Sequence, residues 1–333
     1  MKDILITGGA GFIGFHLAKH LLSQTGTRIT LADNLQRGRL DTDLTKLLET
    51  NPGRITLLTT DLSDRSFYSG FDQNFDHIYH LAAINGTKNF YSMPEEVLRI
   101  NTLSLIYLLE WAANRLQKKP KVCFTSSNEA YAGALESYET LPLPTPENVP
   151  LIVNDTYNPR WTYGATKLIG ELFMIHYAQK FGFPALIVRP HNFYGPRAGY
   201  DHVIPEFCQR ILKREDPFSI FGSDETRSFC YISDAVEAMQ RLMDSPATNS
   251  FPIQTVHIGS TEETNIRQLA ETLFDITGWR PNEIVPKESL PGSVKRRLPD
   301  VTKISRLIDW KAATPLKNGL KETFTWYAAN SKT

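Results

Sequence analysis

A tyrosine and a lysine stand four residues apart in the segment Tyr163-Gly-Ala-Thr-Lys167. In a helix, this spacing places both side chains on one face. A free phenol has a pKa of about 10, and a neighbouring ammonium group favours the phenolate, so such a tyrosine can accept a proton closer to neutral pH. Ser127 follows an expected strand at 121–125, and its hydroxyl could hold the reacting oxygen. Together these residues indicate proton transfer from a substrate hydroxyl.

A glycine-rich turn follows the apolar strand expected at 4–6. Gly9, Gly11 and Gly14 read G-x-G-x-x-G, and Gly8, Gly11 and Gly14 fit the related pattern that starts at Thr7. Glycine allows a sharp turn and lets the backbone approach a pyrophosphate closely. Apolar residues then recur at helical spacing, so a helix N-terminus would face the phosphates. The segment predicts a dinucleotide-binding site.

Two acids follow the next strands of the chain. A strand at 28–32 ends at Asp33, about 20 residues after the last glycine, where a carboxylate accepts a hydrogen bond from a ribose 2′-hydroxyl. A carboxylate there repels a 2′-phosphate and favours NAD over NADP, although Arg37 and Arg39 could bind that phosphate, stack on adenine or face solvent. Asp61 follows a strand at 55–58 and either meets the adenine amino group or caps a helix.

Strands and helices alternate through the first 190 residues. Further strands are expected at 78–81, 121–125 and 185–189, and helices at 42–49, 95–116 and 161–181. The alternation predicts an α/β fold with a doubly wound parallel sheet and right-handed crossovers, with ligands beyond the carboxyl ends of the strands. We expect an NAD-binding Rossmann domain at 1–190, a returning segment near 225–260 that includes a strand at 256–259, and a mainly substrate-binding lobe at 191–333 with a helix at 265–277. Asn101, inside an apolar helix, needs a partner and either ties two loops together or contacts the cofactor.

Composition excludes several classes of function. The 333 residues carry a formal net charge of zero, which argues against a nucleic-acid-binding surface. Three cysteines, Cys123, Cys208 and Cys230, lack the spacing of a metal or redox site, so we expect no metal and buried thiols in a reducing cytoplasm. There is no signal peptide pattern and no apolar run long enough to span a membrane.

These motifs together resemble the extended short-chain dehydrogenases/reductases, in the branch of nucleotide-sugar epimerases and dehydratases. The resemblance runs nearly end to end. Its motifs are TGGAGFIG, Asp33-Asn34, Asp61-Leu62, His80-Leu-Ala-Ala, the Ser127 region, Tyr163-x-x-x-Lys167, Arg189-Pro-His-Asn-Phe-Tyr-Gly-Pro196, Thr226-Arg-Ser-Phe-Cys-Tyr-Ile232 and Arg297-Leu-Pro-Asp300.

The resemblance implies a role for each matching residue. Cofactor contacts would come from Gly8, Gly11, Phe12, Ile13, Gly14, Asp33, Asn34, Asp61, Leu62, Leu81, Ala82, Ala83, Asn101, Tyr163 and Lys167, and sugar-nucleotide contacts from Asn192, Arg227 and Arg297. Tyr163 would remove a proton from a sugar hydroxyl at C4 while hydride passes to NAD, with Ser127 bound to the same oxygen. The 4-keto sugar then reacts and the hydride returns. The long helices at 95–116 and 161–181 would pair two copies into a homodimer.

Only a few residues indicate which reaction of this branch the chain catalyses. Epimerisation of a nucleotide hexose, such as a UDP-sugar, is the main expectation, with 4,6-dehydration or UDP-glucuronate decarboxylation as alternatives. Glu129 resembles the glutamate of the dehydratases and decarboxylases and would work at C5 or orient the sugar, unless it is a solvated loop acid. Asn128 stands where dehydratases have a second acid, and the stretch 85–91 lacks a serine common near Phe90. The residues also leave open a non-catalytic dinucleotide-binding regulator and a plain alcohol or ketone reductase.

Overall fold

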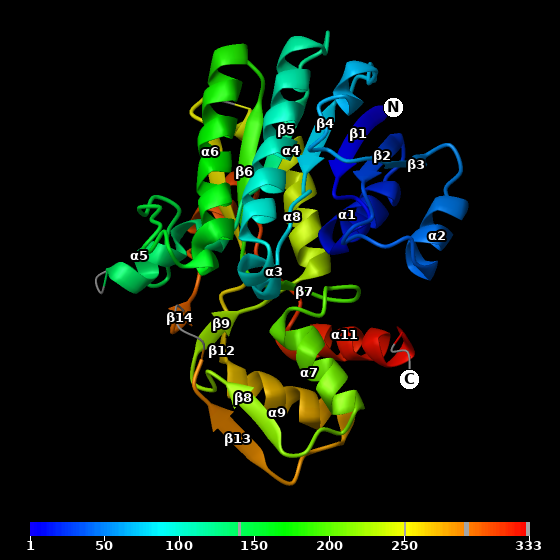
Figure 1. The fold of residues 1–333 in the computed structure, drawn as a ribbon. Coiled ribbons are helices and arrows are strands. Elements are labelled where there is room, and N and C mark those ends of the chain that lie inside the picture. The colour runs from blue at the N-terminus through cyan, green and yellow to red at the C-terminus, as the bar shows by residue number, and fades with distance from the viewer. Residues whose placement is uncertain (139–140, 250, 290–292, 331–333) are drawn as a thin grey trace.

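A seven-stranded parallel sheet forms the centre of the computed structural model, which describes residues 1–138, 141–249, 251–289 and 293–330 (Figure 1). The strand order is β11-β6-β5-β4-β1-β2-β3, and all neighbouring pairs are parallel. The strands are β1 (Lys2–Thr7), β2 (Thr27–Asp33), β3 (Ile55–Thr59), β4 (His77–His80), β5 (Lys121–Thr125), β6 (Ala185–Pro190) and β11 (Gln254–Ile258). The predicted doubly wound parallel sheet is confirmed.

Both faces of this sheet are covered by helices. On one face, Leu5 packs with residues of α4 (Pro94–Asn114) and α6 (Thr162–Phe181). On the other, Ile4 and Ile6 pack with α1 (Phe12–Leu22) and α8 (Ile232–Asp244). Successive side chains of a strand point to opposite faces, and an apolar run buried on both sides is the usual pattern of parallel sheets.

Local sequence explains where several helices begin and end. Pro94 occupies the first turn of α4, where its missing N–H costs nothing. Gly182 ends α6 in the left-handed conformation, at φ 67°. Asn265 and Gln268 form a capping box at the start of α9 (Ile266–Thr277).

The chain after β6 builds a second group of elements below the carboxyl ends of the sheet strands (Figure 1). Its helices are α7 (Val203–Leu212), α9 and α11 (Leu316–Asn330), and its strands are β7 (Phe193–Tyr194), β8 (Phe218–Phe221), β9 (Thr226–Ser228), β10 (Cys230–Tyr231), β12 (Glu263–Asn265), β13 (Ile284–Lys287) and β14 (Arg296–Arg297). Helix α10 (Thr302–Ile308) instead packs against β11 and α8. Short helices α2 (Thr42–Glu49), α3 (Thr87–Ser92) and α5 (Ala132–Ser137) connect strands of the main sheet.

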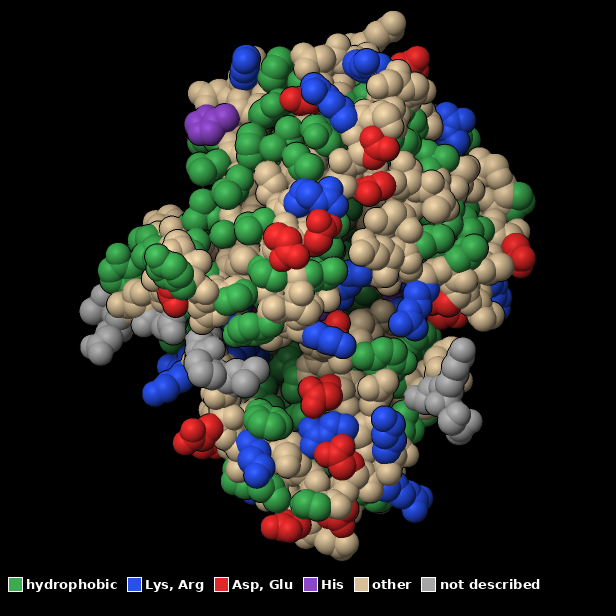
Figure 2. Space-filling model, in the orientation of Figure 1, with side chains coloured by type: hydrophobic (Ala, Val, Ile, Leu, Met, Phe, Trp, Pro, Cys, Tyr) green, Lys and Arg blue, Asp and Glu red, His purple; other side chains and the backbone are tan. Residues whose placement is uncertain are grey.

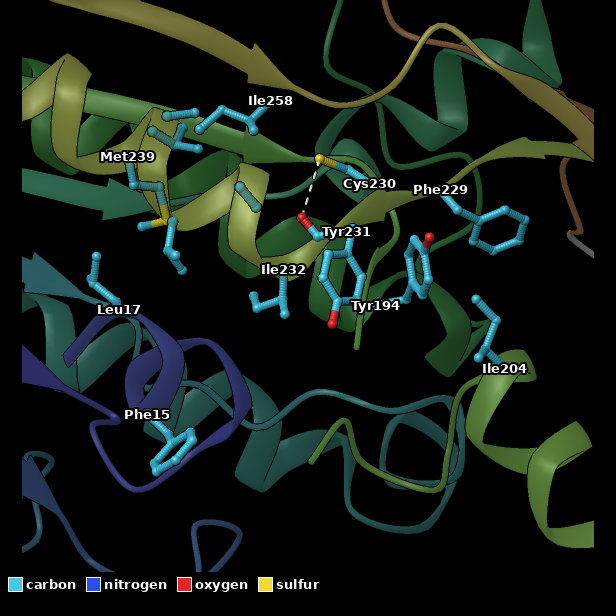
Figure 3. Packing of buried hydrophobic residues seen from close by; sticks show 14 of the residues in the cluster. Phe15, Leu17, Tyr194, Ile204, Phe229, Cys230, Tyr231, Ile232, Met239 and Ile258 are labelled. Carbon is cyan, nitrogen blue, oxygen red and sulfur yellow. Dashed lines mark hydrogen bonds between the residues drawn. The ribbon is translucent and has the colours of Figure 1, made fainter. Parts of the chain in front are cut away.

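One hydrophobic cluster joins the two groups of elements. Figure 3 shows Phe15 and Leu17 of α1 on one side and Tyr194, Phe229 and Tyr231 on the other, and all five belong to the same buried cluster. The ring of Tyr194 meets the ring of Tyr231 edge-on at 5.4 Å between centroids. Shared burial of this kind restricts motion of the lower elements against the sheet.

The returning segment has more structure than the sequence pattern predicts. β11 extends the main sheet beside β6, and α8 packs against α1. Helix α8 was not predicted, although Ile232, Val236 and Met239 repeat at helical spacing and are all buried. The proposed division at residue 190 stays a prediction. Within the described part of the chain, no helix has the length and apolar character needed to cross a membrane.

Candidate active site

A cleft of about 920 Å³ lies at the carboxyl ends of the sheet strands and extends to the lower elements. Most of the predicted site residues line it, from the glycine loop through the Ser127 region to Arg297. They are Gly8, Gly11, Phe12, Ile13, Gly14, Asp33, Asn34, Asp61, Leu62, Leu81, Ala82, Ala83, Ser127, Glu129, Tyr163, Lys167, Asn192 and Arg297. Residues far apart in the sequence meet here because parallel strands all end at one edge of the sheet.

The glycine loop has no room for side chains. Gly8 adopts φ +68°, and a Cβ there would lie 2.8 Å from the backbone nitrogen of Ala82. A Cβ on Gly14 would lie 2.4 Å from the carbonyl oxygen of Gly8. The loop therefore folds tightly against β4 and against the start of α1, as a cradle for a pyrophosphate requires. These residues fit a dinucleotide.

Asp33 is fixed at the end of β2 by backbone N–H groups. Its carboxylate accepts hydrogen bonds from Ala10 N at 3.0 Å and from Leu35 N at 2.8 Å. Burial raises the pKa of Asp33, and these two hydrogen bonds oppose the rise. A carboxylate has about four acceptor sites, so it can still accept from a ribose hydroxyl.

Arg37 and Asp61 have partners within the protein. The guanidinium of Arg37 lies 3.8 Å from the carboxylate of Asp201, and both residues line the cleft. Asp61 accepts from the backbone N–H and the hydroxyl of Ser63, both at 2.8 Å. These hydrogen bonds form a local turn at which no helix of the described chain begins, so Asp61 is not the predicted helix cap, while its contact with adenine stays a prediction.

Asn101 and Arg227 are absent from the cleft lining in the part of the chain that the structure describes. The amide of Asn101 is buried and exchanges hydrogen bonds with the backbone of Ile84, at 2.7 and 3.1 Å. It therefore ties α4 to the loop after β4, and any effect on the cofactor would act through that loop. Arg227 pairs with Glu225 at 2.7 Å, and burial, followed by the charge of Arg297, lowers its pKa to about 10.

Tyr163 and Lys167 lie on the first turns of α6, against the end of β5. The Lys167 ammonium donates to the carbonyl oxygen of Thr125 at 2.8 Å and lies 5.4 Å from the ring centroid of Tyr163. Burial lowers the pKa of Lys167 to about 7, against the opposing charge of Glu171. Burial, followed by the charge of Glu129, raises the pKa of Tyr163, and the nearby hydroxyl of Ser127 opposes the rise.

An aromatic ring that the sequence motifs do not assign to the site packs on this tyrosine. Phe90 of α3 stacks on Tyr163 with 5.2 Å between ring centroids and 15° between ring planes. The sequence indicated only that a serine is lacking near this position. The ring of Phe90 keeps water from one face of the Tyr163 phenol and restricts the orientation of the Tyr163 ring.

Glu129 lies between two arginines and is not a solvated loop acid. Its carboxylate accepts from Arg297 at 2.6 Å and pairs with Arg160 at 2.8 Å. Burial alone would raise its pKa, but the two guanidinium groups outweigh burial and lower the pKa to about 2. A carboxylate held in this way is a weak base, so of its two proposed roles, orienting the sugar is the better supported.

The arginine pair has unused donors. Two guanidinium groups against one carboxylate leave one net positive charge in this cluster. Buried nitrogens of Asn128 (Nδ2), Arg160 (Nη1) and Arg297 (Nε) have no hydrogen-bond partner among the described residues. The cluster lines the cleft, so its net positive charge favours an anionic ligand group at this end.

Comparison with known proteins gives the family. The sequence model of the family described as GDP-mannose 4,6 dehydratase matches residues 5–323. The chain belongs to this family. The predicted nucleotide-sugar epimerase/dehydratase relationship is confirmed, and the similar proteins include decarboxylases and an epimerase.

Several relatives match almost the whole chain. A UDP-N-acetyl-α-D-glucosaminuronate decarboxylase of Bacillus cytotoxicus is 32% identical over 334 residues, covering 98% of each chain. UDP-glucuronic acid decarboxylase 6 of Arabidopsis thaliana is 30% identical over 323 residues, covering 95% of this chain and 86% of the relative. The UDP-glucuronic acid 4-epimerase of Bacillus cereus, solved with UDP-glucuronic acid and NAD, is 26% identical with a TM-score of 0.83, covering 98% of this chain and 99% of that one.

Proposed function

We propose that this member of the family decarboxylates a UDP-linked uronic acid through a transient 4-keto sugar. The observation that carries the proposal is the buried cluster of Glu129, Arg160 and Arg297, with its net positive charge and unpartnered donors. A carboxylate at C6 of the sugar would neutralise that charge and accept those hydrogen bonds. The hydroxymethyl group of a neutral hexose would leave the charge uncompensated.

Bound NAD would supply the hydride acceptor at C4 and later return the hydride. The glycine loop and Asp33 would hold its pyrophosphate and ribose, and Lys167 its nicotinamide ribose. Asn192 and Arg297, which line the cleft, would contact the sugar nucleotide.

The side chains of this protein would perform the proton transfers. Tyr163 accepts the proton of the C4 hydroxyl, and Ser127 donates a hydrogen bond to the same oxygen. In the resulting 4-keto uronate, the carboxylate is β to the ketone. The C5–C6 bond breaks, its electron pair forms the C4–C5 enolate, and CO₂ leaves. One proton then adds at C5, and Tyr163 returns its proton to O4 as the hydride returns to C4.

Epimerisation at C4 is the second candidate, because it needs the same oxidation and the same Tyr163, Ser127 and Lys167. The Bacillus cereus neighbour is an epimerase that was solved with a uronic acid, so a carboxylate pocket alone does not exclude this reaction. 4,6-Dehydration is less supported, because Asn128 cannot protonate a departing C6 hydroxyl.

A panel of nucleotide sugars tests the proposal directly. The purified protein is incubated with UDP-glucuronate, UDP-N-acetylglucosaminuronate, UDP-glucose and dTDP-glucose, and products are followed by mass and NMR. We expect loss of the mass of CO₂ from a uronate and no reaction of the neutral hexoses. An unchanged mass with inversion at C4 would establish the epimerase instead, and loss of water the dehydratase.

We further propose that the enzyme is a homodimer formed through α4 and α6. Figure 2 shows hydrophobic side chains gathered where Figure 1 places these helices, and Leu98, Ile169 and Leu172 are between 37% and 50% exposed there. Light scattering at micromolar concentration should give twice the chain mass, and Leu172→Asp should give a monomer. Phe221→Asp, which removes an exposed ring from β8, is the matched control and should remain dimeric. A monomeric wild type would contradict the prediction.

Location in the cytoplasm is also a proposal. Cys123, Cys208 and Cys230 are buried free thiols, as proteins of a reducing compartment usually have.

A further inference from the structure

Glu171 lies on α6, one turn beyond Lys167 and two turns beyond Tyr163. It is buried and is not among the described residues that line the cleft. Its carboxylate accepts three hydrogen bonds: from Ser126 Oγ at 2.5 Å, and from Arg189 Nε and Nη2, both at 2.7 Å. Such a fully hydrogen-bonded buried carboxylate has one defined position.

The partners of Glu171 belong to the two strands on which α6 rests. Arg189 lies on β6, and Ser126 follows β5 and directly precedes Ser127. The same face of α6 makes a further tie to β5, because Lys167 donates to the carbonyl oxygen of Thr125. One hydrogen bond from Ser126 to Glu171 and one from Lys167 to Thr125 therefore hold the helix that carries Tyr163 to the end of β5, directly before Ser127, and the two hydrogen bonds from Arg189 tie the same helix to β6.

The helix and the strand can be tied this closely because glycines face β5 and the turn after it. A Cβ on Gly164 would lie 2.7 Å from the carbonyl oxygen of Glu129, and a Cβ on Gly170 would lie 2.4 Å from the ring of Phe124. With no side chain as a spacer, the short hydrogen bonds at Glu171 set the distance between helix and strand.

We propose that Glu171, through Ser126 and Arg189, is the positioning residue that holds Tyr163 and Ser127 at the separation needed to bind one substrate oxygen. Of the proposed function, the inference requires only the oxidation at C4, a step that every reaction of this branch shares. Displacing a catalytic group by about 1 Å can lower the rate about 100-fold. The hydrogen bond between Ser126, which lines the cleft, and Glu171, which does not, can therefore control the chemical step.

The charge of Glu171 supports the same role. Lys167 is buried among the ring of Phe124 on β5, the ring of Tyr163 on its own helix and His80 on β4. Glu171 is the negative group that acts on it, and it opposes the burial that lowers the pKa of Lys167. Fixing Glu171 thus also favours the charged form of Lys167.

The test begins with Ser126, because Glu171→Gln would leave the buried charge of Arg189 uncompensated and could unfold the protein. Ser126→Ala removes one hydrogen bond and keeps the ion pair, and Ser126→Cys refills the space with a much weaker donor. We expect both variants to lower kcat roughly ten- to a hundredfold with UDP-glucuronate, or with whichever UDP-uronate the wild type converts, and to leave KM and NAD binding nearly unchanged.

Thr323→Val is the matched control, since the Thr323 hydroxyl is equally buried and bonds Gly319 of α11, away from the cleft. It should lower the melting temperature similarly and leave kcat unchanged. Amide hydrogen exchange without substrate should accelerate at the end of β5 and the first turns of α6 in both Ser126 variants and not in the control. Unchanged exchange, or wild-type kcat in Ser126→Ala, would overturn the positioning role. A wild type inactive on every nucleotide sugar would instead count against the proposed function.

Discussion

Tyr163→Phe is expected to lower kcat by about 10²- to 10⁴-fold, the range that a general base usually contributes. The substitution removes the hydroxyl that accepts the proton and changes the packed volume little. Phe90 would still stack on the remaining ring, so the local structure should persist. NAD should remain bound, because the glycine loop and Asp33 are unaffected.

The measurement is the rate of product formation, with bound NAD determined separately in the same preparation. Tyr157→Phe is the matched control, because Tyr157 is 95% exposed and lies outside the cleft lining of the described residues. If Tyr163→Phe keeps more than about a hundredth of wild-type activity, another group is the base. Loss of NAD in the variant would mean that the substitution disturbed the cofactor site as well.

Glu129→Gln is expected to lower kcat roughly a hundredfold, the order found when a charge-stabilising group is removed from an active site. Without the carboxylate, Arg160 and Arg297 carry two positive charges with no protein counter-charge. They would bind a substrate carboxylate more tightly and so stabilise the ground state. Decarboxylation removes the charge of that carboxylate, so this stabilisation is lost in the transition state. We therefore expect KM to fall together with kcat.

Deuterated water separates the possible reactions of the wild type in the same experiment. Decarboxylation adds one solvent-derived hydron at C5, so NMR of the product should show deuterium there, whereas simple 4-epimerisation adds none. Glu263→Gln is the matched control, since Glu263 forms a two-point ion pair with Arg296 away from the cleft. A fully active Glu129→Gln, with no deuterium at C5 in the wild-type product, would exclude a role for Glu129 beyond C4 inversion.

The pH dependence of stability and of kcat should also reflect the ion pair between Glu129 and its two arginines. The pKa of Glu129 is lowered to about 2, so the ion pair contributes stability that is present above the unfolded-state pKa of about 4.3. That contribution is lost only as the pH falls through the folded value. Glu129 therefore stays charged at every pH above about 5. Above that pH, the dependence of kcat on pH should have the same shape in Glu129→Gln as in the wild type.

Short-range patterns in the sequence predicted residues that the structure brings together at the glycine-loop end of the cleft. The glycines and Asp33 act through backbone geometry and a fixed distance along one strand–turn–helix unit, so their spacing alone locates them. The Tyr163–Lys167 pair is local in the same sense, because four residues in a helix bring both side chains to one face. Alternation of strands and helices was likewise enough to predict the parallel sheet.

The sequence by itself therefore determined the sheet, the cofactor loop and the tyrosine–lysine pair. Only the tertiary structure decided what Glu129 and Arg297 do, since 168 residues separate the two partners of that ion pair. The same holds for Asn101, which is absent from the described cleft lining and bonds the backbone of Ile84, and for Glu171, whose partners come from the end of β5 and from β6. The charge, burial and hydrogen bonding of such groups depend on neighbours distant in sequence, and no local periodicity encodes them.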